Sequence, residues 1–445
     1  MKPVFLQKAV YDDIFTKDRN FYRKTTNRHQ YPILRDDTKT DVLIIGGGLS
    51  GLATAHYLSE MTDMDITLIE RHFLGWGASG RNGGQVLPGY MMPPGRMVRK
   101  FGMEQTKAMW DISLKGVDQI AAITKKYGID CHLTPGAISP IQPEYYNPDA
   151  HKKKRDLLNE LGVETEIYDA DQTQAALNCA PDAYRGALVK KSHAYHFHPL
   201  RYTQGLAHTL NNRIRIFEGT GAVGIDKQDE GDFHVYTAHG MIQTKKIILC
   251  GDSYLGLLAP SLRRKYVLIR NGMIATNVLN DDQQIMPENQ CASEYGGELF
   301  FYRKTYDNRL IIGGGDAVRP NSNFLASEER IIESLKSSIS KIFPSLKTAE
   351  AEYVWGGYIG VTTSYMPYVG TLDPNVFYMG GYSGHGVNLT HAIGALVAAA
   401  VKNNSTQTGT PLDLVRHMSL PGKGNFDVTL ARIGMLLESI YEQFD

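Results

Sequence analysis

The sequence of 445 residues predicts an α/β fold with two interleaved domains. The first observation is a strand, glycine turn, helix and strand over residues 42–69, the pattern of a βαβ unit. The second is another apolar strand, glycine turn and helix over residues 377–401, far along the chain. The third is length, because a chain of this size exceeds one ordinary hydrophobic core.

The remaining elements follow from the spacing of apolar residues. Residues 1–40 are polar and aromatic without a clear period, which indicates an arm lying over the body. Apolar positions three or four apart from Leu430 to Phe444 predict a C-terminal helix packed on the body. Between them we expect helices and strands at these ranges: helices 103–127, 150–161 and 328–342, a small meander over 214–250, and strands 266–278, 298–304 and 309–315.

Composition excludes several classes of protein. The formal net charge is zero, which argues against a nucleic-acid partner. No apolar run approaches the roughly 20 residues of a membrane span, and acidic residues interrupt the N-terminus where a signal peptide needs an apolar core. The cysteines form no metal-ligand or disulfide pattern, so we expect no metal site and a cytoplasmic location. They are Cys131, Cys179, Cys250 and Cys291.

The first glycine turn has the spacing Gly46-x-Gly48-x-x-Gly51 between a strand and a helix. In this context the first glycine allows a tight turn, the second lets a pyrophosphate approach the main chain, and the third lets helix and strand pack closely. Glu70 closes the second strand, where a carboxylate accepts hydrogen bonds from ribose hydroxyls, although the adjoining Arg71 weakens the exclusion of a 2′-phosphate. The unit predicts dinucleotide binding; the alternative is a structural glycine turn.

Two later glycine-rich stretches indicate which dinucleotide binds. Residues 75–85 follow the second strand directly, where a nicotinamide dehydrogenase usually begins an ordinary crossover. Residues 380–386 precede a helix whose positive end, near Val387–Leu389, would offset negative charge on a reduced flavin. One long cofactor, FAD, explains both stretches. The alternative for 380–386 is a sharp turn into a packing helix.

The motifs GWGASGRNGGQ (75–85) and GGYSGHGVNLTH (380–391) make the chain resemble FAD-dependent oxidoreductases of the D-amino-acid oxidase (DAO) superfamily, most of all the gamma-glutamylputrescine oxidase branch. The resemblance runs from about Tyr31 to the C-terminus. It implies a Rossmann-like FAD-binding domain of the GR2/DAO type, interleaved with an α+β substrate domain on a mostly antiparallel sheet. The expected domains are an arm (1–40), an FAD-binding domain (41–100, 197–262, 366–415), a substrate domain (101–196, 263–365) and a C-terminal helix (416–445).

The resemblance also implies which residues contact FAD. The pyrophosphate and ribose residues would be Gly46, Gly48, Ser50, Gly51, Glu70 and Arg71. The residues beside the ring and adenine would be Ala78, Ser79, Asn82, Gly83, Gly84, Gln85, Val223, Gly381, Gly384, His385, Gly386 and Val387. The chain departs from the family at LCGDS, where Cys250 stands in place of the usual small first residue and Asp252 follows shortly after. Relatives with covalent FAD use a cysteine in the C-terminal third, and this segment has none after Cys291, so we expect non-covalent FAD.

The activity implied is oxidation of an amine C–N bond. Hydride passes to the flavin, the imine is hydrolysed to an aldehyde or keto acid, and O₂ becomes H₂O₂. We expect an aliphatic primary amine such as gamma-glutamylputrescine. The alternatives are an amino-acid or N-methylglycine oxidase, a dehydrogenase passing electrons to a quinone or protein, a nicotinamide dehydrogenase, and an FAD-containing binding module without activity. The oligomeric state is left open.

Candidates for the substrate side come from the expected second sheet and the segments beside it. They are Tyr302, Arg303, Trp355, Tyr358 and His198, with His196 as an alternative to His198. An arginine could anchor a carboxylate through two hydrogen bonds. Each has a structural alternative: a surface charge on a hairpin for Arg303, core packing for the aromatic residues, and a hydrogen-bonded helix start for the histidines, since Pro199 suits a first helical turn.

Overall fold

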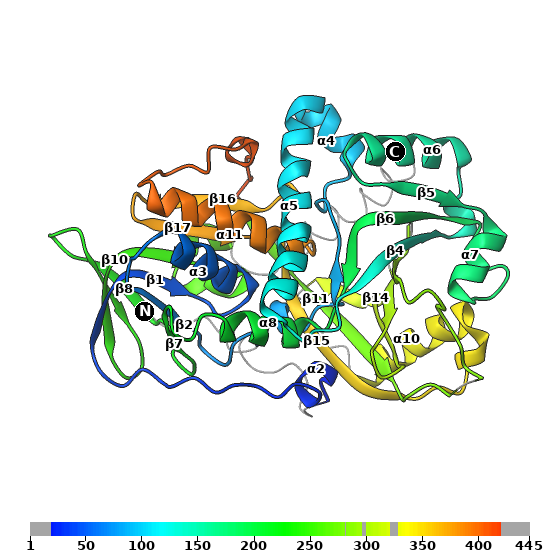
Figure 1. Ribbon diagram of the computed structural model, residues 1–445, viewed down its shortest axis with the longest axis horizontal. Helices are drawn as coiled ribbons and strands as arrows, with labels where there is room; N and C mark the ends of the chain where they lie inside the picture. Colours follow the sequence, from blue (N-terminus) through cyan, green and yellow to red (C-terminus); the bar gives the residue numbers. More distant parts are fainter. Residues whose placement is uncertain (1–18, 281, 296–299, 321–327, 420–445) are drawn as a thin grey trace.

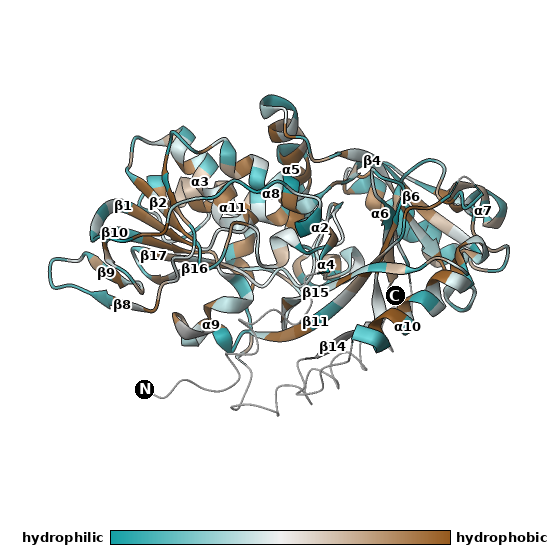
Figure 2. Ribbon diagram, turned by 90° about the horizontal axis from the view of Figure 1, so that it is seen from below, coloured by the Kyte–Doolittle hydropathy of each residue, from teal (hydrophilic) through white to brown (hydrophobic). Residues whose placement is uncertain are grey.

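The computed structural model describes residues 19–280, 282–295, 300–320 and 328–419. Two β-sheets lie on either side of the long helix α5 (Met103–Tyr127), as Figure 1 shows. Strands of both sheets are largely hydrophobic, which Figure 2 shows in brown. The predicted α/β fold class is therefore confirmed.

Within the described residues the first sheet has eight strands. They are β1 (Thr38–Ile45), β2 (Ile66–Ile69), β7 (Arg215–Phe217), β8 (Gly224–Lys227), β9 (Phe233–Tyr236), β10 (Met241–Leu249), β16 (Tyr368–Asp373) and β17 (Val376–Gly380). Their order is β16-β17-β10-β1-β2-β7, with β9 pairing β10 and β8 pairing β9. The neighbours from β17 to β7 pair in parallel. Their carboxyl ends therefore share one edge, the usual ligand-binding edge of an open α/β sheet.

The second sheet has nine strands within the described residues, in the order β15-β11-β14-β13-β12-β4-β6-β3 with β5 beside β6. They are β3 (Gln85–Val86), β4 (Thr134–Ile141), β5 (Thr165–Tyr168), β6 (Gly186–His196), β11 (Tyr266–Thr276), β12 (Cys291–Ser293), β13 (Phe300–Lys304), β14 (Leu310–Pro320) and β15 (Ala351–Thr362). All their pairs are antiparallel except β12 with β4. This mostly antiparallel sheet was expected.

The other described α-helices pack around these sheets. They are α2 (Phe21–Lys24), α3 (Leu49–Met61), α4 (Pro94–Phe101), α6 (Pro148–Glu160), α7 (Ala170–Leu177), α8 (Pro199–His208), α9 (Pro260–Arg263), α10 (Glu328–Ile342) and α11 (Gly386–Lys402). Helix α10 buries Ile331, Leu335 and Ile339, which recur every four residues and face the second core. Burial of each such side chain contributes about 1.5–3 kcal/mol, which holds this helix on its sheet.

Helix α11 crosses both α3 and α5 at close range, and glycines permit it. A Cβ on Gly116 of α5 would lie 2.2 Å from the Asn388 carbonyl oxygen of α11. A Cβ on Gly394 of α11 would lie 3.1 Å from the Thr54 nitrogen of α3. These contacts hold α11 closely against both α3 and α5.

Most predicted elements are found, with shifted ends. Helices 103–127 and 328–342 match α5 and α10, whereas β14 continues to Pro320 beyond the expected 315. Helix α5, expected in the substrate domain, contacts α11, and β3, expected in the FAD-binding domain, pairs with β6. The domain boundaries therefore stay a prediction. The predicted C-terminal helix lies outside the described residues.

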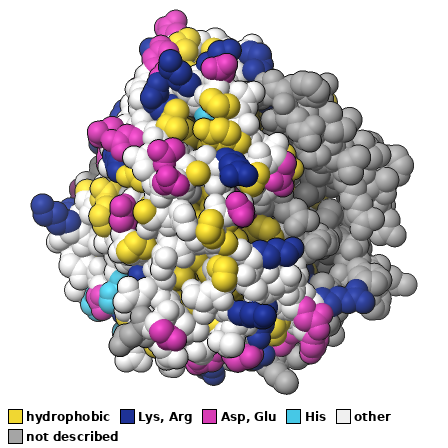
Figure 3. Space-filling model, turned by 90° about the vertical axis from the view of Figure 1, so that its right-hand side faces the viewer, with side chains coloured by type: hydrophobic (Ala, Val, Ile, Leu, Met, Phe, Trp, Pro, Cys, Tyr) yellow, Lys and Arg dark blue, Asp and Glu magenta, His cyan; other side chains and the backbone are white. Residues whose placement is uncertain are grey.

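The described residues also bear on the excluded classes. Figure 3 shows positive and negative side chains interspersed on the face at the right-hand end of Figure 1, consistent with the zero net charge. In the described part of the chain, no helix has the length and apolarity needed to cross a membrane. Nor do the described His, Cys, Asp and Glu residues form a group that could hold a metal ion.

Candidate functional site

The first glycine turn joins β1 to α3 at the shared carboxyl edge. Gly46 has φ +117°, and a Cβ there would lie 2.8 Å from the Cys250 carbonyl oxygen. A Cβ on Gly51 would lie 2.0 Å from the Gly46 carbonyl oxygen, so helix and turn pack backbone to backbone. Side chains are excluded here by geometry, so an anion can approach the backbone at the start of α3 closely.

Glu70 follows β2 and reaches back to this turn. Its Oε2 accepts a hydrogen bond from the Gly47 N–H at 2.8 Å, and its Oε1 accepts one from the His72 N–H at 2.9 Å. Burial raises the pKa of the Glu70 carboxyl, while these N–H groups favour the ionised form. Arg71 lies against Gly221, where its Cγ would be 3.0 Å from an added Cβ. The carboxylate therefore lies where the sequence predicts a ribose contact.

The second glycine stretch lies directly against the first. Its 3₁₀ turn η1 (Ala78–Gly80) presents Ser79, whose Oγ accepts a hydrogen bond from the Leu49 N–H at 2.8 Å. Asn82 braces this turn from within: its amide donates to the Ala78 and Ser79 carbonyls, and its Oδ1 accepts from the Gly84 N–H at 2.8 Å. The stretch is thus held rigidly beside the start of α3.

The end of the second stretch joins the other sheet. A Cβ on Gly83 would lie 2.8 Å from the Phe301 ring, and Gly84 has φ +75°. Gln85 donates from Nε2 to the Ala292 carbonyl at 2.6 Å and accepts from the Ser293 hydroxyl at 3.1 Å. This connection ties the glycine loop to strands β12 and β13.

The third glycine stretch follows β17 at the same edge. Gly381 has φ +65° and donates its N–H to Oδ1 of Asp252 at 2.6 Å. Gly384 has φ +94°, and the nearest atom to an added Cβ would be Cδ1 of Ile359 at 3.9 Å, an ordinary van der Waals contact. The Tyr382 hydroxyl lies 2.9 Å from the Ser50 hydroxyl. The third stretch is therefore bonded to both α3 and the segment after β10.

His385 ends this turn, and α11 begins with Gly386 and Val387. Burial, and then the charge of Lys190, lower the pKa of His385 to about 4, so this imidazole is neutral at pH 7. Its Nδ1 is buried without a hydrogen-bond partner in the described part of the chain. A neutral ring at a helix start leaves the N-terminal dipole of α11 available to an electronegative ligand atom.

Val223 lies near the same edge, but its backbone N–H is already used in a hydrogen bond. Its N–H donates to the Tyr236 carbonyl at 2.8 Å within the meander, which leaves its carbonyl for any contact with a base. The segment reaches Glu70 through Thr220, whose N–H donates to the Glu70 carbonyl at 2.7 Å.

The substrate-side candidates do not gather at one place. Arg303 is near the cradle, since its Nε donates to the Gly83 carbonyl at 2.8 Å. Tyr302 points to the opposite face of β13, where its hydroxyl lies 2.9 Å from that of Tyr184 in the second core. Tyr302 and Arg303 therefore lie on opposite faces of β13, because successive residues of a strand alternate between faces.

Trp355 and Tyr358 also lie on different faces. The Trp355 Nε1 donates to the Arg81 carbonyl at 3.0 Å, so this ring helps to position the second glycine stretch. Tyr358 packs in the core cluster between the two sheets. Both rings belong to packing, which was their structural alternative.

The histidines likewise follow their structural alternative. His198 is the N-cap of α8: its Nδ1 accepts from the Arg201 N–H at 3.2 Å, and its Nε2 lies 2.9 Å from the Thr25 hydroxyl. Burial lowers its pKa well below the ordinary value. His196 bonds through Nε2 to the Asn289 carbonyl at 2.7 Å. Neither ring touches the glycine stretches through a hydrogen bond that the described structure contains.

Three residues near the cradle were not among the predicted site residues. Asp252 holds the third glycine turn, and its position after the strand end LCG was the available signal. Phe301 faces Gly83, which a two-residue alternation starting from Arg303 would have indicated. Lys190 shares this sheet face, as the strand registers show.

The registers pair Phe301 with Ser293, Cys291 with Ala137, and Ala137 with Lys190, and paired residues share a face. The Lys190 Nζ donates to the Ser139 hydroxyl at 3.2 Å, and burial lowers its pKa. No sequence pattern around Lys190 predicted that it shares a sheet face with Phe301.

These features fit a bound FAD. Three bare backbone stretches, where a Cβ on Gly46, Gly83 or Gly381 would collide with neighbours, meet at the carboxyl edge of adjacent parallel strands. Two helix starts, of α3 and α11, lie beside them. The first and second stretches together with Glu70 would hold the pyrophosphate and ribose, and the second and third would hold the ring.

Comparison with known proteins agrees with this geometry. A family model described as DAO, FAD dependent oxidoreductase, matches residues 41–400. The chain is 30% identical to gamma-glutamylputrescine oxidoreductase of Escherichia coli strain K12, covering 95% of this chain and 98% of that protein. It is 22% identical to sarcosine oxidase subunit beta of Rhizobium meliloti strain 1021, over 86% and 89% of the two chains.

Solved structures show the same fold. Glycine oxidase from Geobacillus kaustophilus superposes with a TM-score of 0.70 at 17% identity, covering 86% of this chain and all of that one. Since the family match spans most of the sequence and the cradle fits the cofactor, the chain belongs to the DAO family of FAD-dependent oxidoreductases.

Proposed function

We propose that this protein oxidises the C–N bond of an aliphatic primary amine, with gamma-glutamylputrescine as the leading substrate and O₂ as the electron acceptor. The observation that carries the proposal is the similarity to gamma-glutamylputrescine oxidoreductase over 95% of this chain and 98% of that one. Non-covalent FAD and a cytoplasmic location belong to the same proposal. An amino-acid or N-methylglycine substrate is the second candidate, supported by the similarity to a sarcosine oxidase subunit.

FAD, when bound, supplies the two-electron oxidant for this chemistry. The protein has to hold the amine in its neutral form, because the lone pair assists cleavage of the C–H bond. Lys190, on the same sheet face, would favour the neutral form when it carries its charge, since a nearby cation disfavours an ammonium. Phe301 closes the wall over Gly83 and excludes water from that side. The roles of Lys190 and Phe301 rest on shared sheet face and packing.

The test is an anaerobic panel of amines, followed at the flavin absorption band of the purified protein. We expect gamma-glutamylputrescine to bleach the flavin, and sarcosine and D-amino acids to leave it oxidised. Bleaching by sarcosine alone would replace the proposal with the second candidate. If no amine or amino acid bleaches a protein that carries FAD, the enzymatic assignment fails. Reduced protein that stays colourless in air for minutes would make it a dehydrogenase.

Non-covalent FAD has its own test and its own structural support. All four cysteines are buried, and burial raises the pKa of Cys250 and of Cys291 to about 12, so neither is a thiolate at pH 7. A flavin–cysteine bond needs that thiolate. Acid precipitation should therefore leave the flavin in the supernatant, and a yellow pellet would refute this part.

A further inference from the structure

Amine oxidation needs a neutral amine, but a primary amine reaches the protein as an ammonium ion. Its pKa in water is about 10.4, so at pH 7 only about one molecule in 2,500 carries a free lone pair. The proposed function therefore requires a group that takes this proton inside the site. Among the described residues, Lys190 of β6 has the position and the surroundings to do so.

Lys190 lies on the side of the second sheet that carries the contacts to the flavin cradle. The strand registers place it on the same face as Cys291 and Phe301, and its Nζ donates to the Ser139 hydroxyl at 3.2 Å. Burial, and then the charge of Lys190, lower the pKa of His385, which ends the third glycine stretch. The lysine is therefore near the part of the cradle that would hold the flavin ring.

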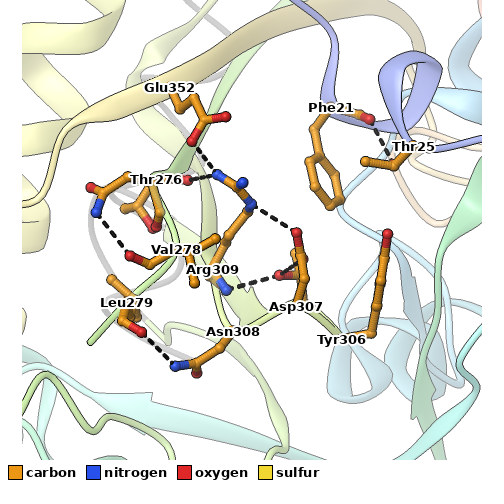
Figure 4. A network of polar contacts seen from close by, with 12 residues as sticks. Phe21, Thr25, Thr276, Val278, Leu279, Tyr306, Asp307, Asn308, Arg309 and Glu352 are labelled. Carbon is orange, nitrogen blue, oxygen red and sulfur yellow. Dashed lines mark hydrogen bonds and ion pairs between the residues drawn. The ribbon is translucent and has the colours of Figure 1, made fainter. Parts of the chain in front are cut away.

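Lys190 forms no ion pair with a carboxylate in the part of the chain that the structure describes. Two acids of the same sheet, Asp307 and Glu352, are held by Arg309, as Figure 4 shows. Lys190 keeps part of its surface accessible, and burial lowers its pKa. Since no anion holds the proton in place, this amine releases it more readily than an exposed lysine does.

The other titratable or charged groups around Lys190 come from several elements. They are Cys291, His385, His193, Asp118 and Arg303. Burial raises the pKa of Cys291 to about 12, so its thiol is uncharged at pH 7. Asp118 of α5 lies 3.5 Å from the His193 ring, so this carboxylate already has a partner. These surroundings leave the amine of Lys190 able to take up a proton.

A substrate amine beside Lys190 would share one proton with it, because a like charge nearby disfavours a second ammonium. We propose that Lys190 is the base that removes the proton of the incoming substrate ammonium. One N–H bond of the substrate breaks, one N–H bond forms at Lys190 Nζ, and the freed lone pair stays on the substrate nitrogen. Lys190 releases the proton to water after the product leaves. This inference rests on the proposed amine oxidation.

The test is the rate of anaerobic flavin reduction at low concentrations of gamma-glutamylputrescine, followed by rapid mixing at increasing pH. With Lys190→Met only the neutral free amine reacts, so the rate should rise about tenfold per pH unit up to the amine pKa of about 10.4. In the wild type the rise should end at a lower pH, at the pKa of Lys190. The variant should be at least about tenfold slower at about pH 8 and approach the wild-type rate near its upper limit.

Two further variants separate the possible roles of this lysine. Lys190→Arg keeps a positive charge but cannot accept a proton, because a guanidinium stays protonated, so it should follow the profile of Lys190→Met. Lys191→Met is the matched control, since Lys191 is exposed and donates to the Tyr168 hydroxyl at 2.7 Å. It should keep the wild-type profile. All variants should carry the same amount of FAD.

Three results would overturn the proposal. A wild-type profile in Lys190→Met would remove the base, and a wild-type profile in Lys190→Arg would make the lysine a fixed cation. Equal slowing of Lys190→Met at every pH would make it a packing residue. A β-fluorinated substrate, whose amine has a lower pKa, should shift the profile of Lys190→Met and leave the wild-type profile in place.

The same experiment separates this inference from the proposed function. If no primary amine bleaches the wild-type flavin, the proposed amine oxidation fails, and the role of Lys190 fails with it. If the wild type is bleached and the profiles of wild type and Lys190→Met coincide, only the role of Lys190 fails.

Discussion

Gly48→Ala tests why the first glycine turn has no side chain at position 48. The glycine either lets the FAD pyrophosphate approach the backbone or makes room for Ser79. Gly48 has an ordinary φ of −87°, so an added methyl causes no backbone strain. The methyl would lie 2.7 Å from Ser79 Oγ and 3.6 Å from Ser79 Cβ. We expect the overlap to lower the free energy of unfolding of the apoprotein by about 1–3 kcal/mol. FAD affinity should fall by about 10- to 150-fold, the cost of one lost hydrogen bond to a charged phosphate.

Adding Ser79→Ala separates the two effects. The remaining Cβ contact at 3.6 Å is ordinary van der Waals distance, so the double variant should unfold like Ser79→Ala alone, within about 0.5 kcal/mol. Ser79→Ala alone costs about 0.5–2 kcal/mol, because the Leu49 N–H loses its acceptor.

The two readouts are urea unfolding of the apoprotein and quenching of FAD fluorescence. The double variant should still bind FAD more weakly than Ser79→Ala does. Equal FAD affinity in those two proteins would show that Gly48 is bare only to accommodate Ser79, and the pyrophosphate argument would fail. Gly95→Ala, where the nearest atom is 3.8 Å away, is the control and should leave FAD affinity unchanged.

Three further changes probe packing and charge. Glu294→Gln tests a buried acid: burial raises the pKa of Glu294 from 4.5 to about 7, so the folded state binds its proton more tightly than the unfolded chain does. Wild-type protein should therefore lose up to roughly 3 kcal/mol of unfolding free energy between about pH 4.5 and 7, and Glu294→Gln should not; parallel pH profiles would contradict this. Trp355→Phe removes the N–H bonded to the Arg81 carbonyl and should lower unfolding free energy by about 1–2 kcal/mol and weaken FAD binding in a fluorescence titration; unaltered FAD affinity would show that the second stretch does not need this brace. Gly116→Ala should cost about 3 kcal/mol in urea unfolding, because its Cβ would meet the Asn388 carbonyl of α11, while Gly95→Ala should stay within about 1 kcal/mol of wild type.

The sequence predicted the parts of the fold that depend on neighbours in the chain. The turn at Gly46 could be predicted from the sequence because three glycines, a strand and a helix lie within one short segment. Helix α10 could be predicted because Ile331, Leu335 and Ile339 repeat with helical spacing. In both cases the physical cause is local, so the residues that produce the structure are adjacent in sequence.

The substrate side was less predictable because β13 is flanked by packing on both faces. Its sequence FFYRK has aromatic side chains on alternating sides, with Phe300 and Tyr302 in the second core and Phe301 against Gly83. A strand packed on both faces shows no polar and apolar alternation, so its register cannot be read from hydrophobicity. For this reason the sequence did not indicate that Phe301 faces Gly83 while Tyr302 faces the second core.

Asp252 shows what strand order adds to a sequence. It lies far along the chain from Gly381, and the two meet only because β10 and β17 are parallel neighbours whose carboxyl ends coincide. Its Oδ1 accepts the Gly381 N–H, so a carboxyl oxygen fixes the turn that begins the third stretch. Since β1 also pairs with β10, the first and third stretches are held at a fixed separation through one intervening strand. The cradle is therefore assembled by the first sheet as a whole, and no single segment of the chain could form it alone.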